Sequence, residues 1–192
     1  AFPGECNFSG QKLDLGLIEL FQSGRGGRAP SAGQWCVFLD AAKLAATSPL
    51  DLSAHPADFA CISFYKMFGY PTGIGALLVR RDRAALLKRT YFGGGTVGAA
   101  ISTERYHVLR EDTAGRFEDG TVSFLSIAAL PVGLAQLRRL GMHAISEHTH
   151  SLAVRTHDAM AALRHAGGQR VAEFYGFDAD PAKHGSVLNF NL

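Results

Sequence analysis

Two residues at the ends of strand-like apolar runs, Lys66 and Asp40, carry side chains that could act together on one ligand. Asp40 directly follows the run at residues 35–39, and Lys66 follows shortly after the run at residues 58–62. In an open α/β sheet, ligands bind beyond the carboxyl ends of the strands. A lysine amine forms a Schiff base with an aldehyde, and a carboxylate can keep a pyridine nitrogen protonated. This pair therefore indicates a site for pyridoxal 5′-phosphate (PLP), held at both ends of its ring.

The residues around Lys66 strengthen this interpretation. Ser63 lies three residues before the lysine, where a hydroxyl at a strand end can bond a cofactor phosphate. Gly69 and Gly73 allow the backbone to approach a ligand closely. However, most lysines are simply exposed, and Asp40 would serve equally well as the N-cap of a helix over residues 41–46. Residue types alone leave both alternatives open.

Three other features carry weaker signals. The glycines at residues 93–95 could cradle a phosphate, but they lack the spacing of a dinucleotide-binding or P-loop motif. Residues 118–121, Glu-Asp-Gly-Thr, are typical of a turn. Four histidines of the later helical region show no His-Glu-x-x-His spacing, so we expect solvent-facing side chains and no metal at His143, His148, His150 and His157.

Composition narrows the class of protein. A chain of 192 residues with 47% hydrophobic and 19% charged residues is typical of a soluble domain with a real core. A net charge of +2 with scattered basic residues gives no case for nucleic acid. The three cysteines suit a reducing, cytoplasmic compartment and form no zinc-type pair. No apolar stretch reaches the roughly 18 residues of a membrane span, and no signal peptide is visible.

Apolar patterns and turn signals predict an alternating α/β chain. We expect strands at residues 35–39, 58–62, 74–79, 170–174 and 186–192. We expect an amphipathic segment at residues 12–22, a helix at 82–90 with Asp82 as its N-cap, and mostly helix from 123 to about 165. Gly141 should separate two helices in that region, and Pro131 should start or kink the first. Residues 23–30 and 92–96 are expected to be loops.

Five blocks of the sequence resemble the amino-terminal domain of the molybdenum cofactor sulfurase family. They are residues 2–10, 40–53, 63–73, 91–97 and 116–125. The blocks occur in family order over nearly the whole chain, and together they are highly specific. That domain belongs to the class V aminotransferase group, beside the cysteine desulfurases. The resemblance implies the α/β architecture of fold type I PLP-dependent transferases, a largely parallel sheet flanked by helices. Residues 1–165 would form the PLP-binding large domain, and residues 166–192 would begin the small C-terminal subdomain.

The resemblance also implies roles for individual residues. Lys66 would hold PLP as a Schiff base, Asp40 would pair with the pyridine nitrogen, and Ser63 would bind the phosphate. Thr121 matches a residue that in cysteine desulfurases reaches the phosphate bound by the other subunit, which implies a homodimer.

Two positions depart from the general desulfurase pattern. Lys43 stands where desulfurases have a glutamine against the cofactor hydroxyl, so we expect it in the cofactor site. Tyr65 stands where they have a histidine just before the lysine. Both departures resemble the sulfurase branch of the group.

The implied activity is that of a PLP-dependent sulfurtransferase. The parent protein would take sulfur from L-cysteine and sulfurate molybdenum cofactor, which activates xanthine dehydrogenase and aldehyde oxidase. The alternatives are a general cysteine desulfurase or other class V PLP enzyme, and a non-catalytic PLP-fold binding module.

The chain starts without Met and stops within a strand-like run, so we expect a fragment that is poorly stable and inactive by itself. The resemblance places a phosphate-binding turn and a ring-stacking aromatic residue before Ala1. It places the sulfur-accepting cysteine and the molybdenum cofactor domain after Leu192. None of Cys6, Cys36 and Cys61 occupies the acceptor position.

Overall fold

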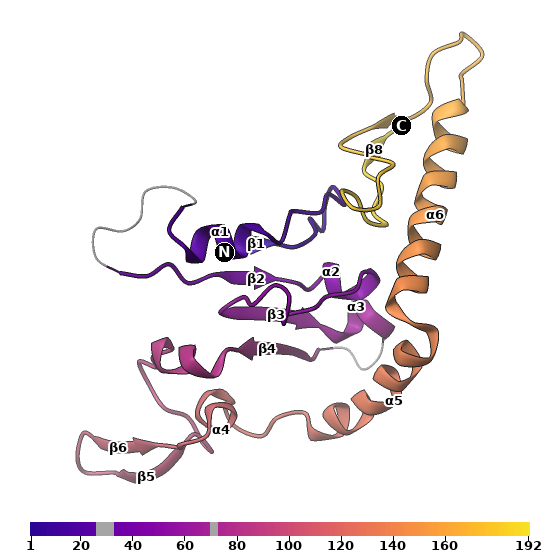
Figure 1. Cartoon of the computed structure of the whole chain (residues 1–192). Coiled ribbons are helices and arrows are strands. Elements are labelled where there is room, and N and C mark those ends of the chain that lie inside the picture. Colours follow the sequence, from indigo (N-terminus) through magenta and orange to yellow (C-terminus); the bar gives the residue numbers. More distant parts are fainter. Residues whose placement is uncertain (26–32, 70–72) are drawn as a thin grey trace.

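A four-stranded sheet lies at the centre of the computed structural model, which describes residues 1–25, 33–69 and 73–192. The strands lie in the order β1 (Phe2–Pro3), β2 (Phe38–Asp40), β3 (Phe59–Ser63) and β4 (Gly75–Val79) (Figure 1). The first three are parallel, and β4 runs antiparallel to β3. The predicted largely parallel sheet is therefore confirmed, with a reversed edge strand.

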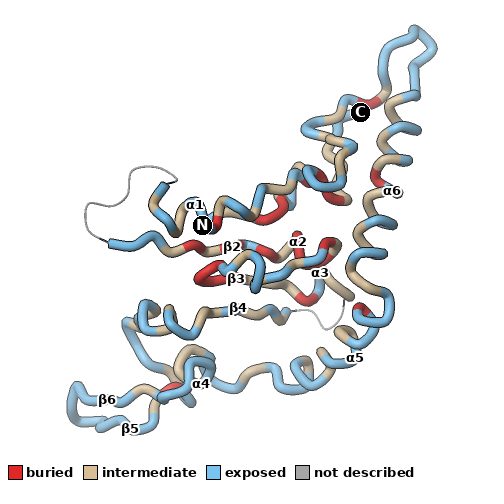
Figure 2. The backbone as a smooth tube through the Cα atoms, in the orientation of Figure 1, coloured by how far each residue is buried: buried red, intermediate tan, exposed pale blue. Residues whose placement is uncertain are grey.

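The core forms on β2 and β3, the two central strands of the sheet. Leu39 and Ala60 are almost completely buried, as is Ile18 on helix α1 (Leu17–Gln22), which packs against the sheet. Figure 2 shows that buried positions gather along β2 and β3. By contrast, the hairpin at residues 97–109 and most of the two long helices at residues 124–162 are exposed. Short apolar strands of this kind are typical of parallel sheets with covered faces.

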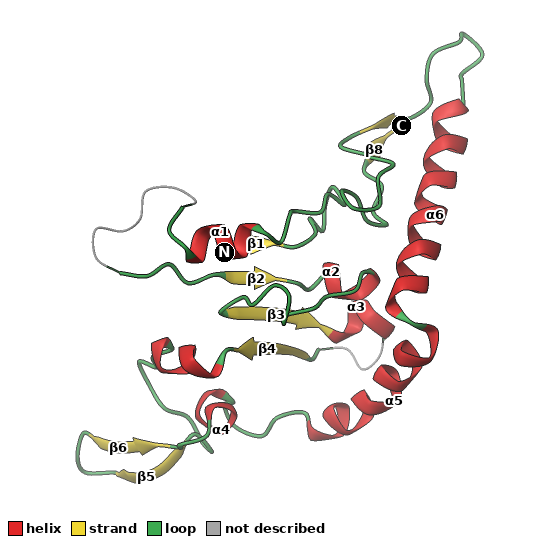
Figure 3. Cartoon of the chain, in the orientation of Figure 1, coloured by secondary structure: helices red, strands yellow, loops and turns green. Residues whose placement is uncertain are grey.

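Most of the helical structure lies at the end of the sheet toward which β2 and β3 point (Figure 3). The short helices are α2 (Leu44–Thr47), α3 (Phe64–Phe68) and α4 (Thr113–Phe117). The long ones are α5 (Phe124–Leu140) and α6 (Met142–Ala162). Gly141 separates them as predicted, with a φ of +81° that other residues rarely adopt. Pro131 lies inside α5, so it does not start that helix.

Several predicted elements differ from the structure. The helix expected at 82–90 is a 3₁₀ helix, η1 (Arg81–Leu86), and Asp82 is not its N-cap. Instead, the Asp82 carboxylate accepts hydrogen bonds from Arg80, which precedes the helix. The expected amphipathic segment is helical only from Leu17, and the expected strand at 35–39 begins only at Phe38.

A hairpin of β5 (Val97–Ile101) and β6 (Tyr106–Leu109) was not predicted. The two late strands exist but are short: β7 (Glu173–Phe174) pairs antiparallel with β8 (Phe190–Asn191). Residues 26–30 of the expected loop, and residues 70–72 of the block around Lys66, lie outside the described residues.

A turn that follows β1 meets a segment from the other end of the chain. We call residues 5–12 the N-terminal hairpin and residues 180–187 the C-terminal strap. Backbone bonds join them from Lys12 N to Lys183 O (2.8 Å) and from Gly185 N to Gly10 O (2.8 Å). His184 of the strap is fully buried, with Nε2 2.9 Å from the Ser9 carbonyl oxygen. The strap thus covers the hairpin, as the indigo and yellow segments show in Figure 1.

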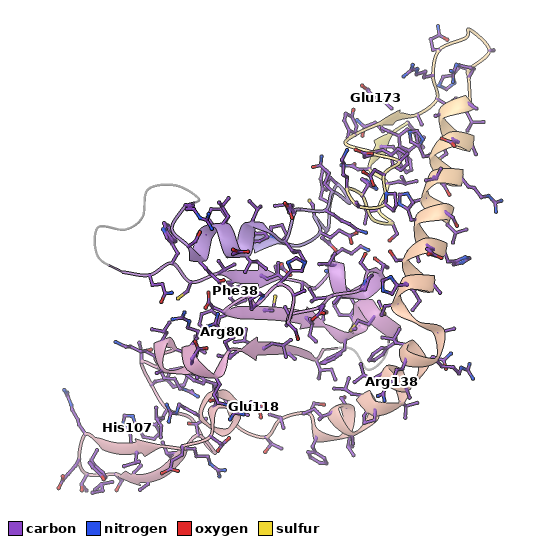
Figure 4. The ribbon with its side chains drawn as sticks, in the orientation of Figure 1. Phe38, Arg80, His107, Glu118, Arg138 and Glu173 are labelled. Atoms are coloured by element: carbon purple, nitrogen blue, oxygen red, sulfur yellow. The ribbon has the colours of Figure 1, made fainter. Side chains whose placement is uncertain are left out.

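Asp58 organises the amino edge of the sheet, just before β3. Its carboxylate is completely buried and accepts hydrogen bonds from Val37 N (2.7 Å), Gln22 Nε2 (2.9 Å) and Arg83 Nε (2.9 Å). A guanidinium nitrogen of Arg80 lies 3.3 Å away, where the reversed strand β4 ends (Figure 4). Burial raises the pKa of Asp58, but these hydrogen bonds and positive charges outweigh it and lower the pKa below its usual value.

No helix within the described ranges is long and apolar enough to cross a membrane.

Candidate functional site

The predicted acid and lysine lie on neighbouring parallel strands, at the same edge of the sheet. Asp40 is the last residue of β2, and Lys66 lies in α3, which directly follows β3. Asp40 pairs in register with Cys61 of β3. The carboxyl ends of parallel strands share one edge of a sheet, so the two side chains start from the edge where α/β proteins bind ligands.

The Lys66 amine is held by a residue from the N-terminal hairpin. Its Nζ donates a hydrogen bond of 3.0 Å to Asn7 Oδ1, and the lysine is half-buried. Sequence reasoning did not single out Asn7. It belongs to the block at residues 2–10 that resembles the sulfurase family, but a lone asparagine has no spacing that marks it. The contact spans 59 positions of sequence and follows from the fold.

The Asp40 carboxylate is exposed and is held through one of its two oxygens. Oδ1 accepts from Ala42 N (3.0 Å) and from Cys61 Sγ (3.4 Å). The alternative role of Asp40 as a helix cap is not realised, because α2 begins at Leu44 with Lys43 at its N-cap position. Burial, and then the charge and hydrogen bonding of Asp40, raise the pKa of the Cys61 thiol.

Ser63 ends β3 and takes the N-cap position of α3 with an extended backbone. It therefore lies at the carboxyl edge, between the strand and the helix that carries Lys66. Gly69 ends α3 with a φ of +79°, and Gly73 has a φ of +78°. These conformations agree with the glycine turns expected around the lysine.

The Lys43 amine contacts both the N-terminal hairpin and the C-terminal strap. Its amine lies 3.3 Å from Glu5 Oε1, 3.2 Å from Ser186 Oγ and 3.3 Å from Thr47 Oγ1. Glu5 is 2% exposed, and no donor among the described residues hydrogen-bonds its carboxylate oxygens, so Lys43 is its ionic partner. At Gly185 of the strap, a Cβ atom would lie 2.1 Å from Glu5 Oε1, so a larger residue there would require the Glu5 carboxylate to move.

Thr121 lies in a separate region, between α4 and α5, and is exposed. The turn before it is fixed by Arg89, whose guanidinium bonds the Asp119 carboxylate and lowers its pKa. Gly120 N also bonds Gly94 O at 2.9 Å, which joins this turn to the triple-glycine loop. In Figure 1 this region lies well away from α3.

The four histidines divide into two pairs. His143 and His148 are exposed as expected. The prediction of solvent-facing rings is wrong for the other two, which are half-buried against residues 174–179. The His157 ring stacks on Phe177 at 4.0 Å, and His150 Nε2 lies 2.9 Å from the Ala179 carbonyl oxygen. Across the described ranges, no three His, Cys, Asp or Glu side chains gather as a metal site would require.

The sheet and its helices have the fold of the fold type I PLP-dependent enzymes. The structure is similar to the cysteine desulfurase CsdA from Escherichia coli, with a TM-score of 0.79 and 22% identity, covering 98% of this chain and 42% of that one. It is similar to the apo cysteine desulfurase from Thermococcus onnurineus, with a TM-score of 0.72 and 22% identity, covering 99% of this chain and 43% of that one. At this identity the likeness shows the fold.

The family follows from the sequence comparison. The family model described as aminotransferase class-V matches residues 27–192, so the chain belongs to that family. It is 49% identical to the molybdenum cofactor sulfurase of Bos taurus and 47% identical to those of Homo sapiens and Arabidopsis thaliana, in each case over all of this chain. The predicted resemblance is thereby confirmed. The chain spans 22 to 24% of the length of these three relatives.

Proposed function

We propose that this chain is the PLP-binding part of a sulfurtransferase of the cysteine desulfurase type. The parent protein takes sulfur from L-cysteine and transfers it to molybdenum cofactor. The observation that carries this proposal is the 49% identity to a molybdenum cofactor sulfurase along the entire chain. The placement of Asp40 and Lys66 at one edge of the sheet supports it, because those residue types at that edge suit PLP.

The donor set at the carboxyl edge fits PLP. We propose that Lys66 binds the cofactor covalently, that Asp40 receives the ring nitrogen, and that Ser63 binds the phosphate. Asp40 Oδ1 is already engaged by Ala42 N and Cys61 Sγ, which leaves the other oxygen for a ring N–H. When bound, PLP supplies an electron sink that acidifies the Cα proton of an amino acid.

The chain's own residues would bind the substrate and move its proton. With PLP and L-cysteine bound, the Lys66 amine would serve as the base that takes the Cα proton of the substrate. Asn7 Oδ1 accepts from this amine and so directs its lone pair and its protons.

Two further residues remain predictions within this proposal. Thr121 would bind the phosphate of a second subunit, so the active form would be a homodimer; its exposed position between α4 and α5 supports that role. Lys43 was expected to contact the cofactor. Its three contacts, to Glu5, Ser186 and Thr47, favour a role in holding the neighbouring segments at the site.

The test uses the full-length protein that carries this chain. It should purify with a PLP absorption band, release alanine from L-cysteine, and restore activity to xanthine dehydrogenase whose cofactor lacks the terminal sulfur. Alanine release without that restoration would favour a general cysteine desulfurase. A protein without any PLP band or alanine release would support the binding-module alternative and contradict the proposal.

A further inference from the structure

The Asp40 carboxylate is held asymmetrically. Oδ1 accepts from the backbone N–H of Ala42 at 3.0 Å and from the Cys61 thiol at 3.4 Å. Within residues 1–25, 33–69 and 73–192, no donor reaches Oδ2. One oxygen is therefore fixed by the protein, and the other is available to a ligand at the carboxyl edge.

The sheet fixes the position of the thiol. Cys61 is the in-register partner of Asp40 across the parallel pair β2 and β3. Ala41 N also donates to Cys61 O at 3.0 Å, directly after Asp40. Since both residues lie on paired backbone, the contact between thiol and carboxylate does not depend on a flexible loop.

The thiol in this contact is a donor and not a nucleophile. Burial and the neighbouring Asp40 carboxylate raise the pKa of Cys61, so its S–H stays protonated at neutral pH. A protonated thiol can donate to the carboxylate, whereas a thiolate would repel it. The same surroundings make Cys61 a poor nucleophile, because reactivity requires the thiolate.

We propose that Cys61 is a positioning residue that orients Asp40 toward the cofactor. Its S–H, with the N–H of Ala42, prevents the carboxylate from rotating and keeps Oδ2 turned to the ring nitrogen. The thiol hydrogen bond also reduces the negative charge on Oδ1. It thereby changes how strongly the Asp40 carboxylate holds the proton on the ring nitrogen. This inference rests on the proposed PLP function, and neither the family match nor the named relatives assign a role to Cys61.

The experiment compares three substitutions in the full-length PLP-bound protein. Cys61→Val keeps an apolar side chain at this position but removes the S–H donor. Cys61→Ala removes the donor and leaves only a methyl group, and Cys61→Ser supplies an O–H donor instead. Cys36→Ala is the matched control, since Cys36 is another half-buried cysteine, situated before β2. The measurements are kcat and KM for alanine release, and the pH titration of the PLP absorption band.

We expect kcat to fall about tenfold in Cys61→Val and Cys61→Ala, the size that one hydrogen bond to a charged group allows. KM should change little, and the titration midpoint of the PLP band should move. Cys61→Ser should recover most of kcat, and Cys36→Ala should match the native protein. In an Asp40→Asn background, Cys61→Val should have little further effect, because the two residues act as one unit.

Two results would overturn the inference. The first is an unchanged kcat and an unchanged titration in Cys61→Val. The second is a loss of the same size whether residue 40 is Asp or Asn, which would show that Cys61 acts only on packing. Either result with a normal PLP band in the native protein would leave the proposed function intact. A native protein without a PLP band would remove the function and this inference together.

Discussion

The two edges of the sheet use the same residue type in opposite ways. At the amino edge, Asp58 is fully buried, and Val37 N, Gln22, Arg80 and Arg83 surround its carboxylate. At the carboxyl edge, Asp40 is exposed and uses one oxygen. A carboxylate whose oxygens are all satisfied can only hold the structure together. A carboxylate with a free oxygen can still receive a ligand, and this difference separates a structural acid from a functional one.

Glu5 is an intermediate case. It is as buried as Asp58, but its charge is met by one partner, Lys43, without a hydrogen bond of good geometry among the described residues. A buried charge with so little compensation contributes little to stability by itself, since desolvation offsets the attraction. The pair of Glu5 and Lys43 instead positions neighbouring segments, because it joins α2, the N-terminal hairpin and the C-terminal strap around the site.

The largest expected effect is at Lys66. Lys66→Ala should abolish the PLP absorption band and reduce alanine release more than a thousandfold, because it removes the amine that would bind the cofactor and take the proton, while the nearby Lys43 amine is engaged by Glu5. Absorption spectra and steady-state kinetics of the full-length protein measure both. Lys88→Ala, an exposed lysine beyond η1, is the control and should keep the band. A Lys66→Ala protein that retains covalent PLP would contradict the assignment.

Asp40→Asn should reduce kcat about a hundredfold or more while most of the PLP remains bound. A neutral amide no longer keeps the ring nitrogen protonated, but the covalent and phosphate attachments persist. The matched variant is Asp58→Asn, which should leave kcat per folded molecule near the native value. Equal losses of kcat in the two variants would contradict the assignment of Asp40 as the functional acid and Asp58 as the structural one.

Asp58→Ala should lower the free energy of unfolding by about 3 to 5 kcal/mol, because Arg80 and Arg83 lose the buried charge that they surround. Urea unfolding followed by circular dichroism measures this change. Asp40→Ala should cost less than about 1 kcal/mol, since Asp40 is exposed. Comparable destabilisation by the two substitutions would mean that exposure does not separate these roles.

The pair of Glu5 and Lys43 should show strong coupling. Lys43→Met alone should destabilise the protein by about 3 kcal/mol, because it leaves Glu5 buried without a counter-charge. Adding Glu5→Gln should recover part of that loss, and the double-mutant cycle in urea measures the coupling. Strictly additive effects would show that the two charges do not depend on each other.

Lowering the pH should reduce the stability that Asp58 contributes at the amino edge of the sheet. The pKa of Asp58 is lower in the folded protein than in the unfolded chain, where an aspartate titrates near about 3.9. Its contribution to stability is therefore complete above that value and is lost as the pH falls through the folded pKa. The stability difference between the native protein and Asp58→Asn should shrink over this acidic range in urea titrations. A difference that stays constant down to about pH 2 would refute the linkage.

The parts of the fold that depend on local pattern could be predicted from the sequence. The apolar runs before Asp40 and Lys66 gave strands of the right order, and Gly141 separated the long helices as expected. The direction of β4 was not predictable, because periodicity carries no information on strand polarity. The β5–β6 hairpin was missed because its strands contain Gly98, alanines and charged neighbours, which give no clear alternation.

The site was predictable where residue type and strand end coincide, as for Asp40 and Lys66. Asn7, Glu5 and Cys61 could not be placed from the sequence, because each acts on a partner that only the fold brings near. Lys43 shows the same limit: its position indicated the cofactor site, but its contacts are set by Glu5 and by Ser186, 143 positions away.

The contact between the hairpin and the strap has a consequence for the order of folding. It joins Lys12 to Pro181 and Ser9 to His184, across 169 and 175 positions of sequence. Closing so long a loop costs chain entropy before any contact repays it, and pairings of this range form slowly. The strap should therefore dock after the β2–β3 core has condensed. Glu5 and Asn7, the partners of Lys43 and Lys66, both belong to the hairpin that the strap covers. The surroundings of the two lysines would therefore be completed among the last steps of folding.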